Sequence, residues 1–338
     1  MAEKLLEVKD LRVSYHTMVG EVQSVRGVSF DMDKGETVAI VGESGCGKSV
    51  TARTIMHLTK TPPAEIKEGS QILFNGEDVL KFEKDRLRQY RGGDAAIIFQ
   101  DALAALNPTM TVGKQIVENI LHHQKMSKKE AWAKAVELLD KVGIPQPEQR
   151  AKQYPHEFSG GMRQRVMIAI AFACDPQLLI ADEPTTALDV TIQAQIMDLI
   201  KKLQKENGTA VILITHDLGV AANIAHKIVV MYAGKIVETG LSHDVFLKPR
   251  HPYTNALMEA VPRLTLENKQ VLASIEGTPP DLLNPPKGCP FCTRCKYCME
   301  ICCNEIPPKA TFEEGHETAC WLYYLDNPRE DAPFTKDV

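Results

Sequence analysis

The chain has 338 residues, of which 44% are apolar and 25% charged, and its formal net charge is −5 at neutral pH. These values are typical of an ordinary soluble globular protein with one large or two linked domains. The acidic balance argues against a general nucleic-acid binder, and no apolar run approaches the ~20 residues that cross a bilayer. The first residues lack the pattern of a signal peptide, so we expect a cytosolic protein.

The N-terminal residues predict two antiparallel strands. Residues 5–15 and 24–32 alternate apolar and polar positions and are separated by a turn that contains glycine. Tyr15 ends the first run. An aromatic residue at this place is either a strand-edge residue or a platform on which an adenine ring stacks, and the residues alone favour the strand edge.

A phosphate-binding loop follows the apolar run at residues 37–41. Residues 42–49 read GESGCGKS, which matches G-x-x-x-x-G-K-[ST] at a strand-to-helix junction. The glycines let successive N–H groups point at phosphate oxygens, and the next helix adds its positive dipole. Lys48 would bind the β- and γ-phosphates, and Ser49 would ligate Mg²⁺. The residues predicted to bind the nucleotide here are Gly42, Glu43, Ser44, Gly45, Cys46, Gly47, Lys48, Ser49 and Val50.

The next segments predict strands and then a helical stretch. A strand pair is expected around residues 70–78, and residues 94–100 read as a buried strand with Gln100 at its exit. Gln100 is either an ordinary polar residue or a side chain that reaches Mg²⁺ or its water. Between residues 103 and 158 the pattern becomes helical, with a capping box at Ser127 and Glu130. We interpret this stretch as a helical insertion in an α/β core.

Paired carboxylates end the next apolar strand. Ser159-Gly160-Gly161 opens an apolar helix and forms a second possible backbone anion site. A continuous apolar run at 177–181 then predicts a parallel strand buried on both faces. Ligands bind at the carboxyl ends of such strands, where this chain has Asp182 and Glu183. Asp182 would hold Mg²⁺ or its water shell, and Glu183 would deprotonate a water that attacks the γ-phosphate.

One more helix and strand complete the α/β pattern. The helix is expected to begin around 186–189 and to run to about Gln204, with Asn207-Gly208 as its stop. Residues 209–215 predict another buried strand, and His216 after it can hydrogen-bond a γ-phosphate. Residues 227–240 read as a hairpin around Ala233-Gly234.

In this order, the motifs resemble those of ATP-binding-cassette (ABC) proteins. The resemblance covers residues ~5–240 and implies that Tyr15 is the A-loop aromatic, which reverses the interpretation from the residue alone. It implies an α/β fold, a P-loop NTPase cassette with an antiparallel β subdomain and a helical insertion at about 103–158, in a nucleotide-binding domain of residues 1–245. The matching positions are residues 42–49 for the Walker A motif, Gln100 for the Q-loop, Ser159, Gly160 and Gly161 for the signature, Asp182 and Glu183 for Walker B, Asp189 for the D-loop and His216 for the H-loop.

The remainder of the chain narrows the resemblance. His251-Pro252-Tyr253-Thr254 and the cysteine segment at 289–320 are similar to the ATPase subunits of dipeptide and oligopeptide importers, a group that includes nickel importers. The signature has Phe158 and Met162 in place of the general Leu and Gln, a variant that suits the peptide-importer branch. The implied function is ATP hydrolysis that powers peptide import. A nickel-importer ATPase is the alternative within the family, and a soluble ABC ATPase acting on nucleic acid or the ribosome is the alternative outside it.

The resemblance also implies roles and partners. Glu183, His216 and Lys48 are implied to be catalytic, and Ser49, Gln100 and Asp182 to hold Mg²⁺. Ser159, Gly160, Gly161 and Asp189 would complete the ATP site of a second cassette, identical or different. The other implied partners are two integral-membrane permeases and, indirectly, an extracytoplasmic peptide-binding protein, with no nucleic acid. The protein would lie peripherally on the cytoplasmic side of the membrane.

Seven of the nine cysteines fall between Cys289 and Cys320, which in a cytosolic chain points to a metal. One candidate ligand set has the spacing of a bacterial ferredoxin run, although Cys303 stands in place of the usual proline. The other set is implied by the importer resemblance, and we favour it. We expect a [4Fe–4S] cluster, with Zn²⁺ as the alternative, that staples a small Cys-rich domain at 246–338. The ferredoxin-like set is Cys292, Cys295, Cys298 and Cys302, and the family-like set is Cys289, Cys295, Cys302 and Cys320.

Overall fold

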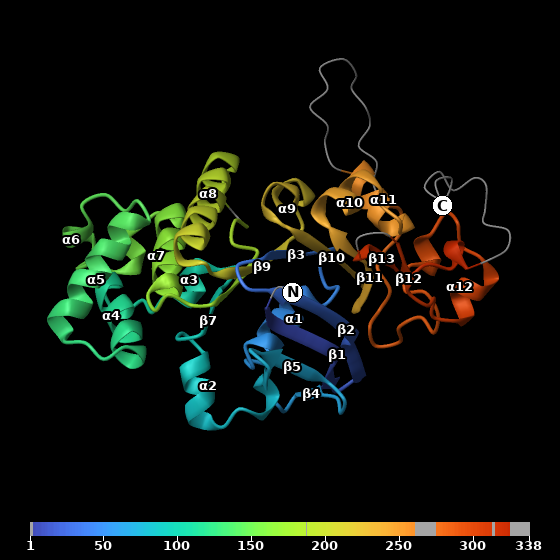
Figure 1. Ribbon diagram of the computed structural model, residues 1–338, viewed down its shortest axis with the longest axis horizontal. Coiled ribbons are helices and arrows are strands. Elements are labelled where there is room, and N and C mark those ends of the chain that lie inside the picture. Colours follow the sequence, from blue (N-terminus) through green and yellow to red (C-terminus); the bar gives the residue numbers. More distant parts are fainter. Residues whose placement is uncertain (1–2, 187, 261–274, 313–314, 325–338) are drawn as a thin grey trace, which may run out of the picture. The chain divides into compact units, whose positions relative to one another are not determined.

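The computed structural model describes residues 3–186, 188–260, 275–312 and 315–324 (Figure 1). These residues form two compact units. The first comprises the described residues of 1–5, 32–36 and 78–214, and the second those of 6–31, 37–77 and 215–338. The domain boundary expected at residue 245 stays a prediction. Residues 261–274, 313–314 and 325–338 of the expected C-terminal domain lie outside the described residues.

The apolar runs of the first unit form a parallel sheet. Its strands are β7 (Ala95–Ile98), β8 (Leu178–Asp182) and β9 (Ala210–Thr215), with β8 between the other two. Ile180 pairs with Ile97 on one side and with Ile212 on the other. Every residue of β8 and β9 is buried. The prediction of parallel strands covered on both faces is therefore confirmed.

Helices make up most of the first unit. Ser127 begins α5 with the predicted capping box, in which its Oγ accepts the Glu130 N–H at 3.3 Å and the Glu130 carboxylate accepts the Ser127 N–H at 2.8 Å. Helices α4 and α5 pack side by side (Figure 1). The expected helical insertion thus contains several helices and short turns. The helices of this unit are η1 (Val79–Lys81), α2 (Lys84–Tyr90), α3 (Ala102–Ala105), α4 (Val112–His123), α5 (Lys128–Lys141), α6 (Pro147–Arg150), η2 (Pro155–Glu157), α7 (Gly160–Phe172) and α8 (Val190–Asn207).

The second unit contains an antiparallel sheet near the N-terminus. Its order is β2-β1-β5-β6, and β4 also pairs with β1. The two long strands confirm the prediction from alternating residues, whereas β4, which follows Pro62-Pro63, was missed because it is only three residues long. The strands are β1 (Lys4–Thr17), β2 (Gly20–Asp33), β4 (Ala64–Ile66), β5 (Gln71–Phe74) and β6 (Glu77–Asp78).

A second group of strands in this unit has the order β12-β13-β11-β10-β3. Strand β3 is parallel to β10, and β10 forms the predicted antiparallel hairpin with β11. Ala233 and Gly234 both have positive φ, as a tight hairpin turn requires. The strands are β3 (Thr37–Val41), β10 (Lys227–Tyr232), β11 (Lys235–Leu241), β12 (Ala310–Thr311) and β13 (Glu317–Thr318). The helices are α1 (Lys48–Ile55), α9 (Leu218–Ile224), α10 (Ser242–Leu247), α11 (Pro252–Glu259), η3 (Cys292–Arg294), α12 (Glu300–Asn304) and η5 (Trp321–Tyr323).

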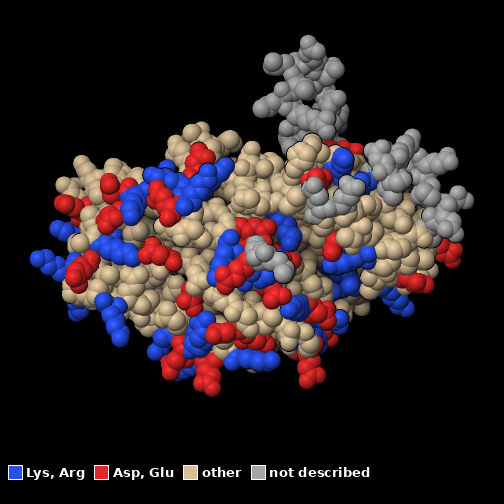
Figure 2. All heavy atoms as spheres, in the orientation of Figure 1, with Lys and Arg blue, Asp and Glu red and all other residues tan. Residues whose placement is uncertain are grey.

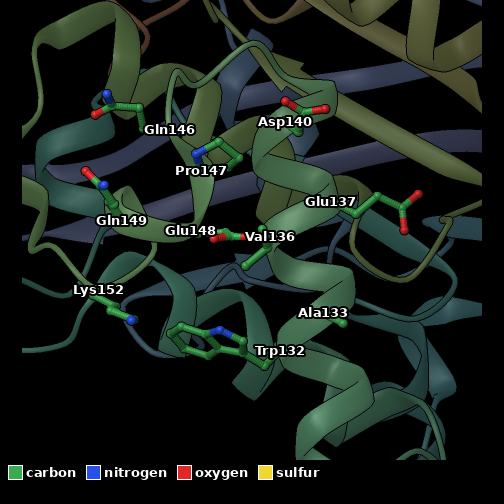
Figure 3. A pocket seen from close by; sticks show the side chains of 10 residues that line it. All are labelled: Trp132, Ala133, Val136, Glu137, Asp140, Gln146, Pro147, Glu148, Gln149 and Lys152. Atoms are coloured by element: carbon green, nitrogen blue, oxygen red, sulfur yellow. The ribbon is translucent and has the colours of Figure 1, made fainter.

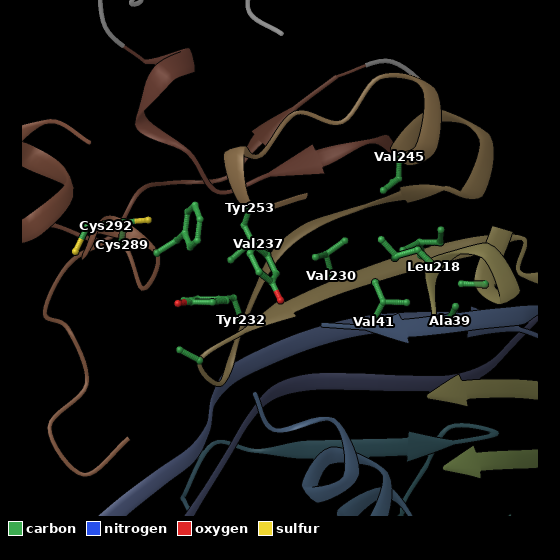
Figure 4. Close-up of a cluster of buried hydrophobic side chains, with 14 of the residues drawn as sticks. Ala39, Val41, Leu218, Val230, Tyr232, Val237, Val245, Tyr253, Cys289 and Cys292 are labelled. Atoms are coloured by element: carbon green, nitrogen blue, oxygen red, sulfur yellow. The ribbon is translucent and has the colours of Figure 1, made fainter. Parts of the chain in front are cut away.

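One buried core joins the strand before the phosphate loop to the cysteine segment (Figure 4). Val41 at the end of β3 belongs to the same cluster as Cys289. The same cluster contains three aromatic rings, with the Tyr232 centroid 4.6 Å from that of Tyr253 and 5.2 Å from that of Phe291. Aromatic rings at these distances bury large apolar areas and add specific contacts. Tyr253, Cys289 and Phe291, all beyond residue 246, therefore share a core with the strand that leads into the loop.

The described residues contain no helix that is both long and apolar enough to span a bilayer. Figure 2 shows acidic and basic side chains intermixed over the visible face.

Candidate nucleotide-binding site

The predicted nucleotide-binding residues are divided between the two units. The second unit carries Tyr15, the loop at residues 42–49, Val50 and His216. The first unit carries Gln100, Asp182, Glu183, Asp189 and the signature residues 159–161. Each set has its own local geometry within its unit.

The phosphate loop needs glycine at two positions of positive φ. Gly42 has φ of 149° and Gly47 has φ of 103°. A Cβ on Gly42 would lie 2.2 Å from the carbonyl oxygen of Met231, and one on Gly47 would lie 2.4 Å from that of Ser24. Any other residue would collide with backbone at both places, because real Cβ contacts are longer. The loop is therefore folded tightly against its neighbours in the second unit.

Lys48 is held inside this loop. It is 4% exposed, and its Nζ donates hydrogen bonds to the carbonyl oxygens of Gly42 at 2.7 Å and Glu43 at 2.9 Å. Burial raises the pKa of the neighbouring Cys46 thiol. The lysine charge is thus fixed within the loop by backbone acceptors. Lys48 is also the first residue of α1, where the helix dipole favours anions.

The carboxylate of Glu183 is held by two donors in the first unit. Its Oε2 accepts hydrogen bonds from Gln100 Nε2 at 3.1 Å and from Thr186 Oγ1 at 2.9 Å. Glu183 follows the buried Asp182 and has φ of +49°, a conformation that costs about 1–3 kcal/mol and recurs at functional sites. The structure therefore brings together two predicted residues, Gln100 and Glu183. It adds Thr186, which was not predicted from the sequence. The available signal was that Thr186 follows Glu183 by three residues, within the same turn.

The predicted signature and D-loop residues begin helices. Ser159 is the N-cap of α7, and its Oγ accepts the Met162 N–H at 3.4 Å. Asp189 is the N-cap of α8, and its Oδ1 accepts the Ile192 N–H at 3.0 Å. Gly160 and Gly161 form the first turn of α7. Side chains at an N-cap leave the remaining first-turn N–H groups directed outward, as an anion site requires.

Tyr15 and His216 lie at element ends in the second unit. Tyr15 is half-buried in β1, opposite Ala64 of β4. His216 is exposed and precedes α9, whose N-cap is Asp217. Tyr15 thus keeps part of its surface exposed, and His216 is exposed. Their roles toward the nucleotide stay predictions.

The family-like cysteines meet at one small cavity. Cys289, Cys295, Cys302 and Cys320 line it together with Cys292, and its volume is about 10 Å³, room for about one water. Burial raises the pKa of the Cys289 thiol to about 12 and also raises that of Cys320. None of the nine cysteines, all within the described ranges, forms a disulfide. Across the described residues, no three or more His, Cys, Asp or Glu side chains are placed to hold a metal ion.

A buried histidine, His251, lines the same cavity as these cysteines. His251 is 1% exposed, and its Nδ1 accepts the Tyr253 N–H at 3.1 Å, so Nε2 carries the ring proton. Burial lowers the pKa of His251 to about 3, which keeps the ring neutral. Within the described chain, Nε2 is buried and has no hydrogen-bond partner. A buried donor beside several cysteines fits a thiolate or sulfide acceptor. The residue types around the cavity, several cysteines and one neutral histidine, thus suit an iron–sulfur or zinc group. The sulfur atoms of the described residues are not arranged as metal ligands.

A larger hollow of about 820 Å³ lies elsewhere, in the helical part of the first unit (Figure 3). Trp132, Val136 and Asp140 of α5 line it, together with Pro147 and Gln149 of α6. None of the residues predicted from sequence to bind ATP, Mg²⁺ or iron lines this hollow. It is therefore separate from the candidate nucleotide-binding residues.

A glycine loop that encloses a lysine, a parallel sheet that ends in paired carboxylates and a helical insertion together define an ATP-binding cassette. Residues 25–186 match the ABC transporter family, and residues 237–302 match the family "Oligopeptide/dipeptide transporter, C-terminal region". The chain belongs to the oligopeptide/dipeptide branch of the ABC transporter ATP-binding proteins.

Its relatives match over nearly the whole chain. The oligopeptide transport ATP-binding protein OppD of Bacillus subtilis (strain 168) is 54% identical over 98% of this chain and 92% of its own length. The dipeptide transport ATP-binding protein DppD of the same organism is 54% identical over 99% of both chains. OppD of Escherichia coli (strain K12) is 51% identical over 95% of this chain and 94% of its own.

Solved structures show the same fold. A dimeric ATP-binding cassette in a post-hydrolysis state, bound to ADP and Pi, aligns with a TM-score of 0.63 at 28% identity. The alignment covers 70% of this chain and 99% of that one. The expected α/β cassette fold is confirmed.

Proposed function

We propose that this chain is an ATP-hydrolysing subunit that powers the import of oligopeptides or dipeptides across the cytoplasmic membrane. The observation that carries the proposal is the joint match of a cassette and an oligopeptide/dipeptide transporter C-terminal region in one chain. The relatives named for oligopeptide and dipeptide transport match this chain almost end to end, which supports the same activity here. A nickel importer is the alternative within this family.

Each candidate residue has a role in this chemistry. The loop at 42–49 would bind the phosphates, with Lys48 supplying the positive charge and Ser49 acting as a Mg²⁺ ligand. Gln100 and Asp182 would hold Mg²⁺ or its water, and Glu183 would accept a proton from the attacking water. His216 would hydrogen-bond the γ-phosphate, and the ring of the half-buried Tyr15 would stack on adenine. The Glu183 carboxylate is already oriented by two donors, which supports its assignment as the base.

A single phosphate loop cannot surround a γ-phosphate, so we propose that the site is completed by a second cassette. The first turn of α7 and the cap residue Asp189 would be supplied by each chain to its partner's ATP. ATP would stabilise the closed pair, and hydrolysis would let it open. This motion would drive two permeases, with a peptide-binding protein delivering peptide outside. The protein would lie peripherally at the cytoplasmic face of the membrane.

Purification with its permeases tests this proposal. The chain, produced with neighbouring membrane subunits and reconstituted in vesicles with its cassettes facing the lumen, is expected to accumulate labelled peptide there when ATP is enclosed in the lumen and the peptide is supplied outside with the peptide-binding protein. Labelled nickel in the same assay is expected not to accumulate. Nickel uptake without peptide uptake would replace the peptide assignment with the alternative.

We further propose that Cys289, Cys295, Cys302 and Cys320 hold a [4Fe–4S] cluster, with Zn²⁺ as the alternative. Two observations support this: the four thiols line one cavity, and that cavity is also lined by His251, whose buried Nε2–H has no hydrogen-bond partner among the described residues. Buried thiols with raised pKa values become thiolates when a metal charge balances them. The cluster would hold the segment together.

Metal analysis tests the cysteine assignment. Protein purified without oxygen is expected to be brown, with iron and sulfide in equal amounts, and Cys320→Ser is expected to lose most of both because it removes one ligand. Cys303→Ser is the matched control, since Cys303 is exposed and lies outside the proposed set. Colourless protein with stoichiometric zinc would favour the alternative, and iron loss in Cys303→Ser equal to that in Cys320→Ser would contradict the ligand set.

A further inference from the structure

Glu43, the second residue of the phosphate loop, forms hydrogen bonds with two residues of the C-terminal region. The backbone N–H of Glu43 donates to the Tyr253 hydroxyl at 2.8 Å. Its carboxylate accepts two hydrogen bonds from Arg294, from Nη1 to Oε2 at 2.6 Å and from Nη2 to Oε1 at 3.0 Å. Tyr253 is on α11, and Arg294 ends the short helix η3 in the cysteine segment. All three residues belong to the second unit.

The arginine has every donor occupied. Besides the two bonds to Glu43, its Nη1 donates to the Tyr232 hydroxyl at 3.1 Å. Its Nη2 donates to the carbonyl of Ile275 at 3.0 Å, and its Nε to that of Glu276 at 2.9 Å. A guanidinium has five N–H donors in a rigid fork, so this site matches arginine and not lysine. The side chain is only 4% exposed, where such an ion pair is little screened.

These contacts lead directly to the loop lysine. Lys48 Nζ is held by the carbonyl oxygens of Gly42 and Glu43. The residue that Arg294 and Tyr253 fix is therefore one of the two that position the Lys48 ammonium. Movement of Glu43 would shift that acceptor, and a positioning error of this kind weakens binding that depends on exact geometry.

We propose that Arg294 and Tyr253 are positioning residues for the ATP site, which act through Glu43 on the phosphate loop and Lys48. The cysteine segment thereby sets nucleotide affinity from within the same chain. The inference rests on the assignment of residues 42–49 as the ATP phosphate loop.

We call the contacts of Arg294 and Tyr253 with Glu43 the clamp. Titration of the full chain with a fluorescent ATP analogue tests its role. Arg294→Met is expected to raise the dissociation constant roughly tenfold, within the range of coupling between neighbouring residues. Arg294→Lys is expected to restore only part of the affinity, because three donors cannot serve five acceptors. In a Glu43→Gln background, Arg294→Met is expected to have a smaller effect than in the parent chain. Equal effects in both backgrounds would overturn the proposed route through Glu43.

Further variants separate positioning from loss of folding. Tyr253→Phe and Glu43→Gln each remove one contact to the clamp and are expected to weaken binding even if Arg294→Met does not fold. Unchanged affinity in both would overturn the inference. The matched control is Lys309→Met, which breaks an exposed ion pair with Glu317 in the same region and is expected to leave affinity unchanged. If Lys48→Ala weakens binding while the clamp variants do not, the clamp fails and the loop assignment stands.

Discussion

Glu183→Gln is expected to lower steady-state ATP hydrolysis by about 10²–10⁴-fold, the usual contribution of a general base, while ATP still binds. The carboxylate accepts hydrogen bonds from Gln100 and Thr186, which orient it at the end of β8. A glutamine side chain has the same shape, and its carbonyl oxygen can still accept from both donors. It cannot take a proton from water. The change therefore separates the chemical step from the fold.

The measurement is phosphate release by the assembled transporter, together with nucleotide affinity of the same preparation. Glu206→Gln serves as the matched control, since Glu206 is an exposed partner of Lys202 at the far end of α8. That control is expected to hydrolyse ATP at the parent rate. Full turnover by Glu183→Gln would show that the water is activated by another group.

Elements whose signals lie within a few neighbouring residues could be predicted from the sequence. The apolar runs at 178–181 and 210–214 form most of two buried parallel strands, as uninterrupted apolar runs predict. The α5 capping box formed because its two partners are three residues apart. Helix α8 runs to Asn207, beyond the expected end near Gln204, and stops where Gly208 adopts positive φ. Local chemistry thus fixed element types better than element ends.

Contacts between distant positions could not be predicted in the same way. Glu43 and Arg294 are 251 residues apart, and no local pattern links them. Glu238 is a second example, because it is buried and its partners are distant in the sequence. It accepts a hydrogen bond from His316 at 2.7 Å and others from the backbone N–H groups of Arg250 and His251. A lone Glu in a strand reads as a solvent-facing residue until its partners are known. The sites where sequence reasoning stops are those built by tertiary contact.

The candidate site shows both limits. The phosphate loop was recognisable because its motif is contiguous in the sequence, and its glycines at 42, 45 and 47 adopt positive φ, which is a local demand. The helix-capping roles of Ser159 and Asp189 also had a local signal, since both are favoured N-cap residues. The orphaned Nε2 of His251 had none, because its burial depends on packing among α11, the cysteine segment and η5.

Lys48→Ala is expected to weaken ATP binding by about 10–150-fold, which corresponds to the loss of a charged hydrogen bond of about 1.5–3 kcal/mol. The ammonium is buried in the loop and donates to two carbonyls, so alanine removes the charge and leaves both oxygens without that donor. Titration with a fluorescent ATP analogue measures the change. Lys60→Ala is the control, because Lys60 is exposed beyond α1 and is expected to leave affinity unaltered. Equal affinities of Lys48→Ala and the parent chain would mean that the loop does not bind the β- and γ-phosphates through Lys48.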